Sequence, residues 1–69
     1  MAGTVARVTE ISATSGTGFE DAVNVGVARA NETLRNVRSA WVKEMQVKVD
    51  GGSITEYQVN LLVTFVLED

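Results

Sequence analysis

Two side chains in this chain have the chemistry needed to hold a planar ligand. Trp41 stands in the segment RSAWVKEMQV (38–47) and is the only tryptophan, and Gln58 stands in the strand-like segment EYQVNLLVTF (56–65). An indole face offers stacking, and a glutamine amide offers both a donor and an acceptor to the edge of a heterocycle. From spacing alone the plainer interpretation is preferred, in which Trp41 fills a subunit interface and Gln58 faces solvent.

Catalytic chemistry has little support in the sequence. The chain has no His and no Cys, and its serines have no evident base partner. The adjacent carboxylates Glu20 and Asp21 suit the first turn of a helix, and the segment GTG (16–18) is too short for a phosphate-binding loop. Zinc and copper sites of the usual kind need His or Cys. We therefore expect a protein that is not an enzyme.

Length and composition favour one small domain that assembles with copies of itself. The 69 residues fit a single domain, 1–69, and a chain this short needs a disulfide, a metal or oligomerisation for stability. Disulfides are excluded because there is no cysteine. The net charge is −3 with six scattered Lys and Arg, which argues against a nucleic-acid partner. We see no signal peptide and no apolar run of ~20 residues, so we expect a cytoplasmic protein with no membrane partner.

The first half of the chain predicts a strand followed by a helix. Residues 4–12 are rich in β-branched types and predict a strand, and residues 13–18 predict a loop. A helix is expected from Gly18 to Arg35 or Val37, opened by a capping box of Thr17 and Glu20. Apolar residues recur at helical spacing on one face: Phe19, Ala22, Val23, Gly26, Val27, Ala30, Leu34 and Val37. Small residues on this face indicate close packing against a sheet.

The second half predicts two strands joined by a tight turn at DGG (50–52). In residues 39–49, strict alternation predicts one face with Trp41, Lys43, Met45, Val47 and Val49, and the other with Val42, Glu44, Gln46 and Lys48. In residues 54–67, it predicts an apolar face with Tyr57, Val59, Leu61, Val63, Phe65 and Leu67. The expected fold is α+β in the order β-α-β-β, with a three-stranded antiparallel sheet packed on one helix. The uncovered face and open edges are a second indication of assembly.

The chain resembles the dodecins over nearly its whole length. The resemblance rests on VTEISATS leading into FEDAV, on ARANETLRNV, on WVKE, and on the final segment EYQVNLLVTFVLED. It implies a β-α-β-β protein that assembles into a hollow homododecamer. It also implies non-enzymatic binding of a flavin (riboflavin, lumichrome, FMN or FAD) at two-fold axes, for storage and protection from photochemistry.

Within this resemblance, Gln58 matches the glutamine that reads the edge of the flavin ring. The family's stacking tryptophan corresponds to Ser39 here, and Trp41 stands where the family has a glutamate. Positions two apart share a face of a strand, so Trp41 is expected beside the family position, displaced by about 6–7 Å. Gln46 stands where many members have an arginine, and Glu44 matches an acidic position near the ribityl chain or an ion.

Two functions follow as hypotheses. In the first, a flavin-binding dodecamer uses Trp41, Gln58, Ser39, Glu44 and Gln46, and Trp41 lines a shifted version of the family's site. In the second, the site is remodelled and the chain forms a structural or ion-binding (Ca²⁺ or Mg²⁺) dodecamer without flavin, with Trp41 packed in an interface. The retention of both Gln58 and a nearby tryptophan favours the first.

Overall fold

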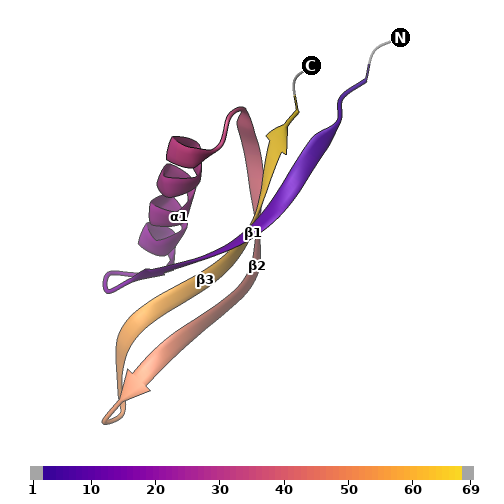
Figure 1. Cartoon of the computed structure of the whole chain (residues 1–69). Helices are drawn as coiled ribbons and strands as arrows, with labels where there is room; N and C mark the ends of the chain where they lie inside the picture. The colour runs from indigo at the N-terminus through magenta and orange to yellow at the C-terminus, as the bar shows by residue number, and fades with distance from the viewer. Residues whose placement is uncertain (1–2, 68–69) are drawn as a thin grey trace.

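The computed structural model describes residues 3–67, which form three strands and one helix. They are β1 (Ala6–Ser15), α1 (Phe19–Thr33), β2 (Val37–Asp50) and β3 (Ser53–Val66). The strands form one antiparallel sheet in the order β1-β3-β2, with α1 lying against one face (Figure 1). This architecture confirms the predicted β-α-β-β fold. Within residues 3–67, no helix has the length and apolarity that a bilayer crossing requires.

Small residues let α1 lie close to the central strand. Val59, Leu61 and Val63 of β3 are fully buried under the helix, as the alternation predicted, and Ala22, Gly26 and Ala30 face them. A Cβ atom at Gly26 would lie 2.8 Å from Leu61 Cδ1 and 3.1 Å from Ala13 Cβ. The expected close packing at Gly26 is therefore confirmed, because any side chain there would collide with the core.

The helix begins differently from the prediction. The capping box of Thr17 and Glu20 is wrong, because Gly18 is the N-cap residue and makes no side-chain cap hydrogen bond. Instead the Ser15 hydroxyl donates to Asp21 Oδ2 at 2.6 Å and accepts from the Thr17 backbone N–H at 2.9 Å. The cause is the length of β1, which continues to Ser15 rather than ending at residue 12 and so brings this hydroxyl to the start of α1.

The helix also ends earlier than residues 35–37. It stops at Thr33, because Leu34 is extended and Asn36 adopts a left-handed conformation with φ of 59°. This turn sends the chain directly into β2. At the other end of β2, Gly51 and Gly52 have φ of 59° and 80°, and Asp50 pairs with Ser53. The hairpin turn expected at residues 50–52 is therefore confirmed, and its two turn residues are Gly51 and Gly52.

A bulge in β2 corrects the predicted faces of that strand. Val42 pairs with Leu61 and Glu44 pairs with Asn60, so the register shifts by one residue at Lys43. Strict alternation placed Trp41 and Glu44 on opposite faces, which is wrong because the extra residue of a bulge reverses the alternation beyond it. Trp41 pairs with Leu62, and both lie with Glu44 on the sheet face opposite α1, which we call the far face.

Candidate functional site

The far face is a grid of side chains, since residues that lie opposite one another across the three strands form rows. Successive rows are about 7 Å apart along the strands. From the end near the termini toward the hairpin, the rows in the order β1, β3, β2 are Val8, Thr64 and Ser39; Glu10, Leu62 and Trp41; Ser12, Asn60 and Glu44; Thr14, Gln58 and Gln46.

Two glutamines meet in the last of these rows. Gln46 Nε2 donates to Gln58 Oε1 at 3.1 Å. Gln58 Nε2 in turn donates to Ser12 Oγ at 3.1 Å and to Asn60 Oδ1 at 3.3 Å. Both N–H groups of Gln58 are thus used, which fixes the orientation of its amide and turns Oε1 toward Gln46. Further ligand contacts are left to the second lone pair of Gln58 Oε1 and to the remaining N–H and the carbonyl of Gln46.

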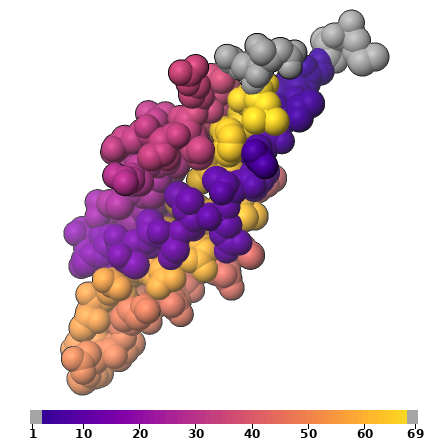
Figure 2. Space-filling view, viewed as in Figure 1, coloured from indigo at the N-terminus to yellow at the C-terminus, as the bar shows by residue number. Residues whose placement is uncertain are grey.

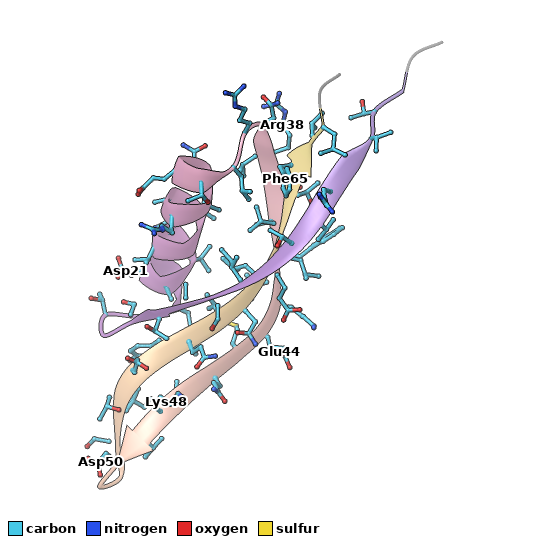
Figure 3. All side chains as sticks on the ribbon, in the orientation of Figure 1. Asp21, Arg38, Glu44, Lys48, Asp50 and Phe65 are labelled. Atoms are coloured by element: carbon cyan, nitrogen blue, oxygen red, sulfur yellow. The ribbon has the colours of Figure 1, made fainter. Side chains whose placement is uncertain are left out.

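Glu44 adds a charge beside this amide pair. Its Oε1 accepts a hydrogen bond from Asn60 Nδ2 at 2.9 Å, and it points away from α1 (Figure 3). An open hollow of about 130 Å³ is lined by Glu44, Met45, Gln46, Gln58 and Asn60. Three of the five residues predicted from the sequence, Glu44, Gln46 and Gln58, therefore lie around one depression.

The structure places Trp41 near this hollow but not in its lining. The indole is 64% exposed and lies one row from Glu44 and two rows from Gln58, a separation of roughly 13 Å along β3. Ser39 shares the far face, as the spacing of two predicted, and lies one row farther from the amides. The displacement of the tryptophan from position 39 to 41 therefore moves it toward Gln58. A single protomer does not bring Trp41 and Gln58 into contact.

An ion pair crosses the row that contains Trp41. Lys43 Nζ lies 3.1 Å from Glu10 Oε1, so the bulged residue of β2 reaches over β3 to the other edge strand. Both side chains are about half exposed, so the pair adds little stability. The positive charge of Lys43 is therefore paired with Glu10 and not with Glu44, its neighbour along the chain.

Neither the largest other hollow nor the acidic side chains of the described residues suggest a second specific site. A groove of about 540 Å³ runs between α1 and β1, but its lining is mostly apolar and it contains none of the predicted residues. Among residues 3–67, no group of three or more His, Cys, Asp or Glu side chains could hold a metal ion.

Ser12 and Asn60 were missed as site residues. Asn60 follows Gln58 by two, so the alternation that placed Gln58 on the far face carried the signal for Asn60 as well. Ser12 had no comparable signal, because its position beside Gln58 depends on the register between β1 and β3. That register is set by packing under the helix.

Comparisons with known proteins agree on one family. The Dodecin family model matches residues 5–68. A dodecin of Thermus thermophilus is 39% identical over 67 residues, covering 97% of each chain. A crystal structure of a protein from the same organism is also 39% identical and matches with a TM-score of 0.91, covering 97% of this chain and 98% of the other. The dodecin of Streptomyces coelicolor is 35% identical with a TM-score of 0.92, covering 100% of this chain and 99% of the other. The calcium-chelating antigen calcium dodecin of Mycobacterium tuberculosis, described with a novel calcium-binding site, is 35% identical with a TM-score of 0.81, covering 94% and 93%.

Proposed function

The chain belongs to the dodecin family, and on that premise we propose that it is a non-enzymatic flavin-binding protein. Its ligand would be riboflavin, lumichrome or FMN, stored and shielded from photochemistry in a cytoplasmic homododecamer. The observation that carries this proposal is the amide pair Gln46–Gln58, held by Ser12 and Asn60 on the same face as the exposed Trp41.

The chemistry of these side chains fits a flavin. The pyrimidine ring of a flavin carries an N–H between two carbonyl groups, so its edge alternates acceptor, donor and acceptor. The free N–H of Gln46 can donate to one of these carbonyl groups, and the free lone pair of Gln58 Oε1 can accept from the ring N–H. The indole of Trp41 supplies an exposed aromatic face, and the small Ser39 in the next row leaves space beside it.

Assembly would complete the site. Trp41 and Gln58 lie two rows apart in one protomer, so a ligand that touches both must lie along the far face or between two such faces. We propose that the ligand binds at a two-fold axis of the assembly, as the resemblance to dodecins implies, between the far faces of two protomers. In that arrangement, the amide pair reads the ring edge and Trp41 stacks on the ring, while no group of the protein takes part in a chemical step.

Titration of riboflavin with the apo-protein tests the proposal. We expect flavin emission to be quenched and to saturate near one flavin per subunit, with binding confirmed by equilibrium dialysis. Gln58→Leu keeps the size of the side chain but removes the amide, and we expect at least a tenfold rise in Kd because a site built to hydrogen-bond its ligand loses that contact. Glu32→Gln on the exposed face of α1 is the control and leaves Kd unchanged. Unaltered emission together with no retention in dialysis at saturating protein would refute flavin binding.

A second candidate function is a calcium- or magnesium-binding dodecamer without flavin. The calcium-chelating relative from Mycobacterium tuberculosis favours it, and the Glu44 carboxylate lies beside the Asn60 amide in the hollow. Carboxylate and amide oxygens are the ligands these ions prefer. Calorimetry with Ca²⁺ distinguishes the two functions: heat of binding that saturates, in a protein that leaves riboflavin emission unaltered, supports the second.

A further inference from the structure

Among residues 3–67, Glu44 is the only charged residue that lines the hollow beside the amide pair. Its carboxylate is hydrogen-bonded to the neutral amide of Asn60, and within residues 3–67 no cation lies within salt-bridge distance of it. Gln46, which follows two residues later on the same strand, is neutral and donates to Gln58. The hollow therefore presents an uncompensated negative charge to any ligand that binds there.

The neighbouring charges do not offset this carboxylate. Lys43 is paired with Glu10, and Lys48, the next charged residue of β2 toward the hairpin (Figure 3), lies opposite Glu56 in the register with β3. Glu10 and Glu56 each lie next to a lysine, whereas Glu44 does not. The rows from Glu10 to Glu56 therefore carry a net charge of −1, which belongs to Glu44.

From this arrangement we infer that Glu44 makes the site selective for flavins without a phosphate, riboflavin and lumichrome, over FMN. The inference rests on the proposed function and orders its ligands. A phosphate monoester carries nearly two negative charges at pH 7. For a phosphate held one row from Glu44, at a distance of roughly 7 Å, Coulomb repulsion in water would weaken binding about five- to tenfold at low ionic strength. Salt reduces this penalty, since the Debye length falls below that distance in concentrated salt.

The experiment is a comparison of Kd values for riboflavin and FMN by equilibrium dialysis, which does not depend on quenching. It uses the full chain, the variant Glu44→Gln and the control Glu32→Gln. Glu44→Gln keeps an oxygen that can accept from Asn60. Both variants remove one negative charge per subunit. Only Glu44→Gln removes it from the hollow, because Glu32 lies on α1. Each titration is run at two salt concentrations. At about 20 mM the Debye length is longer than about 7 Å, so the repulsion acts, and at about 500 mM it is shorter, so the repulsion is screened.

We expect the parent to bind riboflavin about fivefold or more tightly than FMN in low salt, and the ratio to approach one in high salt. Glu44→Gln should lower the low-salt ratio at least threefold, and Glu32→Gln should leave it unchanged. Equal affinities of the parent for both ligands, or equal effects of the two variants, would overturn the selectivity assigned to Glu44 and leave flavin binding standing. Failure of the parent to bind riboflavin would overturn flavin binding itself, and the selectivity with it.

Discussion

Trp41 is a large aromatic side chain that the protomer leaves mostly in solvent, at 64% exposure, on the face that carries the amide pair. Exposed aromatic residues beside polar groups are typical of surfaces that contact something else. A stacked ligand and a neighbouring subunit would both cover this indole. The two roles differ in what happens when the ring is removed, because only stacking affects the ligand directly.

Replacement of Trp41 separates these roles. For Trp41→Ala, we expect the Kd for riboflavin to rise about tenfold, the value for one lost aromatic stack, and flavin quenching to disappear. Trp41→Phe should restore most of the affinity while quenching stays weak, since the phenyl ring stacks but is a poorer electron donor. The measurement is dialysis for affinity and emission for quenching, with sedimentation to check that both variants assemble.

Two results would contradict a stacking role. If Trp41→Ala assembles and still quenches the flavin, the indole is not in contact with the ligand. If it loses assembly instead, Trp41 acts as interface packing, which is the alternative that its spacing allows.

The candidate site was partly predictable from the residues themselves. Gln58 was identified from its amide chemistry and again through the resemblance to dodecins, and Gln46 through the resemblance alone. The structure brings their amides within 3.1 Å. What the sequence does not contain is the hydrogen-bond chain from Gln58 to Ser12, which lies 46 residues earlier. Such a contact follows from the pairing of β1 with β3, and strand register is a property of the packed sheet.

At the scale of elements, the bulge at Lys43 decides which residues share a face. In a regular strand, Trp41 would point to the opposite face from Glu44 and Gln46. The extra residue lets Val42 lie opposite the buried Leu61 while Trp41, Glu44 and Gln46 all lie on the far face. No local residue pattern marks this bulge, so the element order was predictable but the faces of β2 were not.

The spacing between α1 and the sheet depends on Gly26. We expect Gly26→Ala to lower the free energy of unfolding by about 1 kcal/mol, although alanine favours a helix by nearly that amount. The reason is overpacking, which costs about 1–3 kcal/mol, because the new methyl would meet the fully buried Leu61 and the Cβ of Ala13. Urea unfolding at fixed protein concentration measures the change, since assembly makes stability depend on concentration.

A control on the exposed side of α1 isolates helix propensity from packing. Ala28 is exposed, so Ala28→Gly should lose only the propensity difference, about 1 kcal/mol. Stabilisation by Gly26→Ala of the same size would mean that the helix can move away from β3 at no cost, and the close approach would not be a requirement of the fold.

At the scale of the whole molecule, the chain is more extended than a compact monomer of the same length. Its radius of gyration is 14.5 Å, against about 11 Å for a compact chain of this length. Its accessible surface is 5056 Å², against about 4,200 Å² for a compact monomer of 7.4 kDa. Within residues 3–67, only six hydrophobic residues are buried, and three of these are alanines. The excess surface supports the proposed assembly, in which other copies would cover part of it.

The β2–β3 hairpin contributes much of that surface. It projects beyond α1 (Figures 1 and 2), so the helix does not cover its end. Val49 and Ile54 are opposite each other there and are 61% and 51% exposed, and Met45 is also exposed. A cross-strand apolar pair that stays more than half exposed contributes only a small part of what full burial would give. We therefore expect a neighbouring copy to cover these side chains.

A charge at the hairpin end should therefore break the assembly. We expect the parent to sediment as a dodecamer and Val49→Lys to shift it to smaller species, because an ammonium buried in an interface without a partner costs several kcal/mol per contact. Ser53→Lys is the matched control: it adds the same side chain to the same hairpin, at a polar position opposite Asp50, and should leave the dodecamer intact. If Val49→Lys sediments like the parent, the hairpin end lies outside the interface. A monomeric parent would contradict assembly altogether, and the site on the far face would then have to hold its ligand with one Trp41 and one amide pair roughly 13 Å apart.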